Sequence, residues 1–382
     1  MYLDNNSTTR VDPRVFEAMA PYLLEEYGNP ASTTHEMGRR AKEAVEVARQ
    51  KIASLIHATP EEIVFTSGAT ESNNLAIRGV CTHRSAKTRR IVTSLLEHRA
   101  VLDPIRRLEK ESFEVSRLKG FDRKGAVDAE ELSGAIAPSC DLLSLMLANN
   151  EIGTIGDFNL IAELKSRSKF VFHCDAAQAL GKIAIDVRQS PVDLMSFSGH
   201  KLHGPKGVGA LYVRRGTRLK PVIDGGGHER GKRSGTLNVG GIVGFGTAAG
   251  IVAAELSEIR THLQRLTTEC WRKLTRKIEG VYLNGPPIDE RLPGNLNITI
   301  DGVDAETLTL KIPRICISTG SACTSADPEP SHVLQAIGLS EMAARASIRI
   351  GLSRFTTDEE VDFAVQAIAD AVFELRQLNR EL

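Results

Sequence analysis

Apolar and polar residues follow two different periods along the chain. Between residues 38 and 56, alanine, valine and isoleucine recur every three or four positions among charged residues, which predicts an amphipathic helix. The run Ile63–Thr66 is short, apolar and rich in β-branched residues, and the glycine-containing segment 67–70 follows it directly. This order predicts a strand, a turn and the start of a second helix.

Strand-like and helix-like segments continue to alternate towards the middle of the chain. We predict strands at 90–93, 142–148 and 170–173, each followed by a helix, at 98–110, 159–167 and 176–180. Such alternation is typical of a largely parallel sheet covered by helices, the α/β class.

From about residue 248 the pattern changes to a long charged helical stretch at 253–278. A strand at 296–299 and a second amphipathic helix at 358–378 follow it. We therefore predict a large domain at residues 13–250. Residues 1–12 and 251–382 are predicted to form a smaller α+β domain packed on it.

Composition adds the class of protein. The chain has 382 residues, of which 41% are hydrophobic and 25% charged, as in soluble globular proteins. The 48 basic residues balance the 48 acidic ones, so charge gives no reason to expect direct binding of nucleic acid or membrane. The N-terminus lacks a basic segment followed by an apolar run, and six cysteines form no regular framework. We expect a cytoplasmic protein with reduced thiols and no membrane span.

Three segments carry candidate chemistry. The turn at 67–70 leads into a helix N-terminus, which suits a phosphate, although Ser67 or Thr70 could simply cap that helix. Asp175 follows a predicted parallel strand, where α/β sheets place ligand sites, and it too could be a helix cap. Lys201 lies in the segment Ser198-Gly199-His200-Lys201, and an amine in such a setting suits Schiff-base chemistry. A polar surface loop is the alternative for Lys201.

Considered together, the three segments indicate a binding site for one cofactor. A phosphate site, an acid that pairs with a pyridinium nitrogen and a lysine that forms a Schiff base are what pyridoxal 5′-phosphate requires from a protein.

Six motifs span the chain: SGATESNNLAI, ANNEIG, an H-x-D-A-x-Q type segment at 173–178, SFSGHKLHGPKG, GGGHERGKRSGT and STGSACTS. With these motifs in family order, the chain strongly resembles the cysteine desulfurases of the NifS/IscS group, which belong to the class-V aminotransferases and the fold-type I enzymes of pyridoxal phosphate. The resemblance implies a mainly parallel seven-stranded sheet in the large domain and a small domain that carries the Cys323 loop.

The resemblance also implies roles for individual residues around the cofactor. Lys201 would bind pyridoxal phosphate covalently and later move the Cα proton. Asp175 would pair with the pyridine nitrogen, and Gln178 would bond the ring hydroxyl. His98 would stack over the ring, where an imidazole can also move protons.

Further residues would bind the phosphate and the substrate. The family's phosphate site corresponds here to Ala69, Thr70, Ser198 and His200. Thr236 would reach the phosphate bound by a neighbouring subunit, which implies a homodimer. Asn150 would contact both cofactor and substrate, and Arg349 would grip the substrate carboxylate through two parallel hydrogen bonds.

Cys323 is the candidate nucleophile. Small and turn-forming residues surround it, which predicts an exposed loop, whereas Cys316 lies in a segment that resembles a half-buried strand. By resemblance, Cys323 takes the sulfur of L-cysteine as a persulfide, alanine is released, and an acceptor protein receives the sulfur for iron–sulfur cluster assembly or another thiolation pathway. A selenocysteine lyase, an aminotransferase and a non-catalytic scaffold remain alternatives. No metal site is expected, because the His and Cys pairs lack zinc-type spacing.

Overall fold

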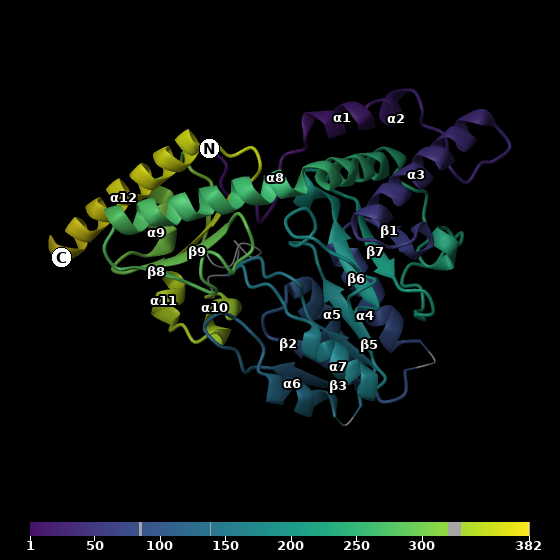
Figure 1. Cartoon of the computed structure of the whole chain (residues 1–382), viewed down its shortest axis with the longest axis horizontal. Coiled ribbons are helices and arrows are strands. Elements are labelled where there is room, and N and C mark those ends of the chain that lie inside the picture. Colours follow the sequence, from purple (N-terminus) through teal and green to yellow (C-terminus); the bar gives the residue numbers. More distant parts are fainter. Residues whose placement is uncertain (84–85, 138, 320–329, 382) are drawn as a thin grey trace.

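Two sheets of different size organise the chain in the computed structural model, which describes residues 1–83, 86–137, 139–319 and 330–381. The larger sheet has seven strands in the order β1-β7-β6-β5-β4-β2-β3, and the smaller has four in the order β10-β11-β9-β8. Figure 1 shows the two sheets side by side, with the long helix α8 running along both.

The seven-stranded sheet is parallel except at β7, which runs antiparallel to both of its neighbours, β1 and β6. This confirms the predicted mainly parallel sheet. Its strands are β1 (Ile63–Thr66), β2 (Arg90–Ser94), β3 (Glu114–Leu118), β4 (Leu142–Ser144), β5 (Val171–Asp175), β6 (Leu194–Ser198) and β7 (Gly209–Val213).

Both faces of this sheet are covered. Successive residues of one strand point into different hydrophobic cores: Val64 belongs to one and Phe65 to the other, and Leu142 and Leu143 divide in the same way. This burial on two faces explains why the strands read as continuous apolar runs. The helices of this part are α1 (Pro13–Met19), α2 (Pro21–Leu24), α3 (Glu36–Leu55), α4 (Ala69–Cys81), α5 (Arg99–Lys110), α6 (Ala129–Ile136) and α7 (Asn159–Arg167).

The four-stranded sheet is antiparallel throughout. The N-terminus joins it: the Leu3 amide donates to the Cys316 carbonyl at 2.9 Å, and Asp4 forms a bridge with Gly351. This agrees with the smaller α+β unit, while the boundary at residue 250 stays a prediction. Its elements are β8 (Val281–Leu283), β9 (Asn295–Ile300), α9 (Ala305–Lys311), β10 (Ser318–Thr319), α10 (His332–Ala336), α11 (Glu341–Arg345), β11 (Ser347–Gly351) and α12 (Asp358–Glu381).

Helix α8 (Val239–Lys277) begins fourteen residues before the predicted start at 253, which was therefore wrong. Glycines interrupt the helical pattern in the first half of α8, and they allow this helix to pack closely against its neighbours. A Cβ on Gly246 would lie 2.5 Å from Ala48 Cα of α3. Among the described residues α8 alone is long and apolar enough to span a membrane, but 56% of its apolar window is buried inside the protein, as in a core helix.

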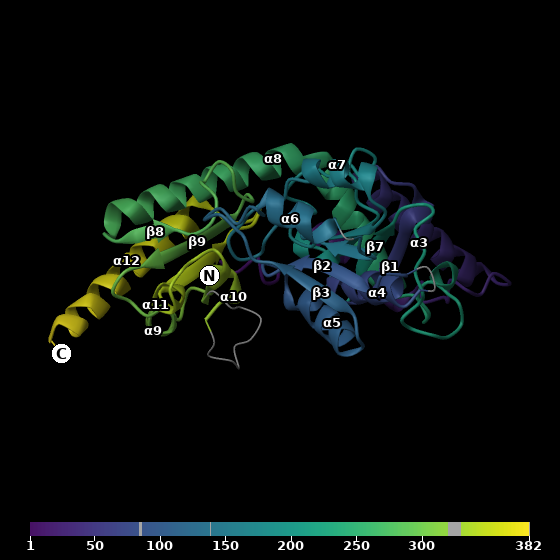
Figure 2. The same cartoon turned by 90° about the horizontal axis from the view of Figure 1, so that it is seen from below.

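The predicted helix at 176–180 was also wrong, because this segment is a turn. Gly181 follows it with φ of +88°, and Leu180 and Ile183 form an isolated bridge, so the chain folds back at once. Figure 2 shows the molecule from below, with the seven-stranded sheet beside the smaller one. The turn follows β5, on the edge where the carboxyl ends of the parallel strands meet.

Candidate active site

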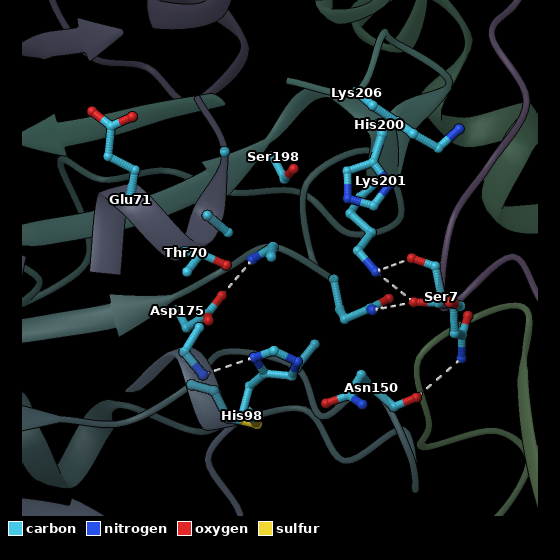
Figure 3. Close-up of a pocket in the computed structure, with 18 of the residues that line it drawn as sticks. Ser7, Thr70, Glu71, His98, Asn150, Asp175, Ser198, His200, Lys201 and Lys206 are labelled. Atoms are coloured by element: carbon cyan, nitrogen blue, oxygen red, sulfur yellow. Dashed lines mark hydrogen bonds between the residues drawn. The ribbon is translucent and has the colours of Figure 1, made fainter. Parts of the chain in front are cut away.

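A cavity of about 400 Å³ opens at the carboxyl ends of the parallel strands. Its size is typical of pockets for a cofactor or small molecule. Figure 3 shows side chains from distant segments pointing into it. Ten of the predicted site residues line it: Ala69, Thr70, His98, Asn150, Asp175, Gln178, Ser198, His200, Lys201 and Arg349.

One end of the cavity suits an anion. Helix α4 starts there, its N-cap is Gly68, and no side chain caps its amides, so the alternative of a cap by Ser67 or Thr70 is wrong. Ser198 and His200 lie beside this helix end, and the buried Nδ1 of His200 has no hydrogen-bond partner. A phosphate would satisfy both the exposed amides and this nitrogen.

The cavity also holds a buried carboxylate. Asp175 ends β5 and is 6% exposed. Its Oδ2 accepts from Asn73 Nδ2 at 2.7 Å, and its Oδ1 accepts from the backbone amide of Ala177 at 2.9 Å. The second bond closes a local turn, so Asp175 caps a turn and no helix. The carboxylate is held rigidly, as a partner for a pyridinium nitrogen requires.

Lys201 belongs to the short 3₁₀ turn Gly199–Leu202 that follows β6. Its Nζ donates to the backbone carbonyls of Asn6 and Ser7, each at 2.6 Å (Figure 3). The start of the chain therefore enters the site, a contribution that the sequence did not predict. A motif at the extreme N-terminus, Asp4-Asn5-Asn6-Ser7, was the available signal.

His98 has two roles. It is the N-cap of α5, where its Nδ1 accepts from the Ala100 amide at 3.0 Å, and its ring also lines the cavity. One imidazole therefore caps a helix and lines the cavity.

Arg349 lies on β11 and is 1% exposed. Its guanidinium donates to Asp4 Oδ1 at 2.8 Å, Ser318 Oγ at 3.1 Å and the Asn150 carbonyl at 3.1 Å, while its Nε has no partner. The four-stranded sheet thus contributes the positively charged Arg349 side chain to a cavity that is formed mainly by the larger part of the chain.

The described cysteines divide into two kinds. Cys81, Cys140, Cys174 and Cys270 are buried, and burial raises the thiol pKa of each well above its usual range. Cys316 is exposed, while Ile315 before it is buried and Ile317 after it is partly buried, so Cys316 lies on the outer side of a segment that is buried on one face. Cys316 lies just before β10 and forms an isolated parallel bridge with Tyr2 of the N-terminal segment. Cys323 lies outside the described residues.

Two further predictions concern sites outside the cavity. Thr236 is exposed and does not line the cavity of its own chain. Within the described part of the chain, no group of three or more His, Cys, Asp or Glu side chains could hold a metal ion.

The donor set fits pyridoxal phosphate. The cavity combines a lysine amine, a buried carboxylate, an uncapped helix N-terminus and the unpartnered His200 Nδ1, which are the groups that a phosphorylated pyridine aldehyde needs.

Comparisons with known proteins agree with this geometry. Residues 1–363 match the aminotransferase class-V family. A protein named cysteine desulfurase IscS from Neisseria meningitidis serogroup A is 49% identical, covering 99% of this chain and 94% of its own length. A solved structure titled NifS-like protein is 38% identical with a TM-score of 0.91, covering 98% of this chain and 99% of its own. A structure titled SspA in complex with cysteine is 36% identical, has a TM-score of 0.81 and covers 93% and 99%.

Proposed function

The chain belongs to the class-V aminotransferase family and, within it, to the cysteine desulfurases, and we propose that it moves the sulfur of L-cysteine onto Cys323 and releases L-alanine. The observation that carries this proposal is the convergence of Lys201, Asp175 and the α4 N-terminus on one cavity. These are the three groups that the cofactor of this family requires.

We propose that Lys201, Asp175 and Gln178 hold the ring of pyridoxal phosphate. The amides of Ala69 and Thr70, with Ser198 and His200, would hold its phosphate. When bound, this cofactor withdraws electrons from the Cα of an amino acid, which makes the Cα proton removable. Burial, and then the positive charges of Lys201 and Lys206, lower the pKa of His200 to about 4, so His200 is a neutral imidazole before a phosphate enters the site.

The remaining cavity residues would act on the substrate. We propose that Arg349 and Asn150 bind its carboxylate, which is supported by the buried position of the Arg349 guanidinium between Asp4 and the Asn150 carbonyl. Lys201 Nζ would carry the proton at Cα, and His98, held by Ala100, would keep its ring beside the cofactor.

The sulfur step needs no external oxidant. The Cys323 sulfur forms a bond with the substrate sulfur while the substrate Cβ–S bond breaks, and its electron pair stays on carbon, which takes a proton to become the alanine methyl. The net reaction converts the Cys323 thiol and L-cysteine into the Cys323 persulfide and L-alanine. We propose that an acceptor protein then takes the sulfur for iron–sulfur cluster assembly or another thiolation pathway.

We also propose a cytoplasmic homodimer in which Thr236 completes the phosphate site of the partner subunit. The exposed position of Thr236 supports this arrangement. So does the surface of α1 and α2, which exposes large apolar side chains that a partner would cover. They are Phe16, Leu23, Leu24 and the nearby Tyr27.

The test is a product balance. Purified protein loaded with pyridoxal phosphate, given L-cysteine and a thiol reductant, should form equal amounts of alanine and sulfide. Cys323→Ser should abolish sulfide while the bound cofactor keeps its absorbance. Cys316→Ser, which removes the exposed thiol among the described cysteines, should behave as the unchanged protein. Absence of alanine, or full sulfide from Cys323→Ser, would contradict the proposal.

A further inference from the structure

A second lysine lies buried beside Lys201. Lys182 is 6% exposed and follows Gly181, whose φ is +88°. A Cβ on Gly181 would lie 2.9 Å from Leu202 Cβ, which is closer than real Cβ contacts allow. Glycine is therefore required for the backbone that carries Lys182 to pack against the turn that carries Lys201.

The partners of Lys182 are amides rather than carboxylates. Its Nζ donates to Asn6 Oδ1 and to Gln178 Oε1, both at 3.2 Å. The charged and titratable groups that act on it are Lys201, Arg349 and His203. Burial, and then the charges of Lys201 and Arg349, lower the pKa of Lys182 to about 7. A lysine kept here without a carboxylate needs another reason for its position.

The reason lies in the amide of Gln178. In its charged form Lys182 only donates hydrogen bonds, so it binds the oxygen end of that amide and leaves the NH₂ group on the other side. Gln178 Nε2 then donates to the Asn6 carbonyl at 2.7 Å, the same carbonyl that accepts from Lys201 Nζ. The side-chain oxygen of Asn6 accepts the hydrogen bond from Lys182, so Asn6 connects both lysines with Gln178. Figure 3 shows the hydrogen bonds of Lys201 in this group.

We propose that Lys182 is a positioning residue of the cofactor site, which holds Gln178 Oε1 so that the Gln178 NH₂ group faces the ring hydroxyl of pyridoxal phosphate. The inference rests on the proposed function, in which Gln178 binds that hydroxyl. Lys182 does not line the cavity itself and acts through Gln178.

The test is a double-mutant cycle on the full chain with Lys182→Met and Gln178→Ala. The readouts are the dissociation constant for pyridoxal phosphate and the pH midpoint of the absorbance change of the bound cofactor. Lys182→Met should weaken binding about tenfold, the effect of one misdirected hydrogen bond to a charged oxygen. It should also raise the pH midpoint, because a donor to the ring oxygen and a nearby positive charge are both lost. In the Gln178→Ala background, Lys182→Met should weaken binding no further.

Matched variants separate positioning from folding. Lys169→Met, at an exposed lysine, should leave both readouts unchanged. If Lys182→Met does not fold, Lys182→Gln, which keeps an N–H donor without the charge, should retain near-normal affinity. Additive losses in the cycle, or unchanged readouts in Lys182→Met, would overturn the inference. A parent protein that takes up no pyridoxal phosphate would instead contradict the proposed function.

Discussion

Asn73 Nδ2 donates a 2.7 Å hydrogen bond to Asp175 Oδ2 across 102 residues of sequence. Asn73 lies in the first turns of α4, the helix whose N-terminus faces the phosphate end of the cavity, and it is fully buried. One short helix thus serves two ends of the proposed cofactor site, because it presents amides to the phosphate and a side-chain donor to the acid.

We expect Asn73→Ala to weaken pyridoxal phosphate binding by about tenfold to a hundredfold, the usual effect of losing a hydrogen bond to a charged group. Asp175 would keep only the Ala177 amide as a partner, and its carboxylate could rotate away from the ring nitrogen. Asn74→Ala is the matched control, since Asn74 is the next residue and bonds the Thr70 carbonyl of its own helix. Equal affinities for the two variants, measured by absorbance titration, would show that Asn73 does not position the acid.

The second prediction concerns pH. Glu151 is buried and accepts a short hydrogen bond from Ser331, the N-cap of α10. Burial raises the pKa of Glu151 to about 7, against the lowering effects of the Ser331 bond and the charges of Arg349 and His98. Because the folded protein holds this proton more tightly than the unfolded chain, Glu151 makes stability fall as pH rises from about 4.5 to about 7.

We expect Glu151→Gln to remove this fall, since glutamine can accept the same bond without ionising. The free energy of unfolding of the variant minus that of the parent should increase between pH 5 and pH 8 by on the order of 3 kcal/mol at most. Urea unfolding at each pH measures it. Buried histidines such as His173 and His203 titrate in both proteins, so the difference isolates Glu151. A difference that is independent of pH would mean that Glu151 stays ionised.

The sequence predicted the sheet better than its surroundings. Short apolar runs located β1, β2, β5 and β9 to within a residue or two, because buried strands leave a local signal in the sequence. The start of α8 escaped prediction because its glycines reflect close packing against α3, which is a tertiary requirement. The turn after Asp175 escaped for a similar reason, since it depends on the contact between Gly181 and Leu202.

Sequence motifs predicted several of the cavity residues. They did not predict the contacts that hold those side chains in position. Lys201, Asp175 and His98 stand in segments with a family pattern. Asn73 lies inside the motif SGATESNNLAI, but the motif does not show that its side chain reaches Asp175, 102 residues away. Lys182 lies in none of the motifs and only follows a glycine. Partners of this kind become visible only when the fold brings the segments together.

The third prediction concerns the segment that leads to Thr236. Glu229 and Arg230 in the 3₁₀ turn Glu229–Gly231 both have positive φ, 49° and 58°. Such conformations are unfavourable for these residues. The Glu229 carboxylate holds the turn in place: Arg49 bonds it with two parallel hydrogen bonds at 2.7 and 2.8 Å, and the Phe65 amide donates to it at 2.7 Å. Both side chains of this ion pair are buried.

We expect Glu229→Gln to lower the free energy of unfolding by about 3–5 kcal/mol, because the buried Arg49 charge loses its buried counter-ion and keeps only the half-exposed Glu46. Trypsin should then cleave faster in the segment 230–233. Arg265→Met is the control: it breaks the exposed pair with Asp358 and should change stability by about 1 kcal/mol or less. Urea unfolding and timed proteolysis measure the two effects. A loss no larger than that of the control would show that the pair does not anchor the segment.

The last prediction compares two glycines of α8 that lie four residues apart. A Cβ at Gly246 would meet the Ala48 backbone at 2.5 Å, whereas at Gly250 the nearest atom, Lys51 Cδ, lies 3.7 Å away. Gly246→Ala should therefore destabilise the protein by about 1–3 kcal/mol through overpacking. Gly250→Ala should stabilise it by up to about 1 kcal/mol, because alanine restricts the unfolded chain and favours helix. Thermal unfolding of the two variants with cofactor bound gives the signs directly. Stabilisation by both would mean that α3 and α8 can separate by a few tenths of an ångström without loss, and that the glycines do not set their spacing.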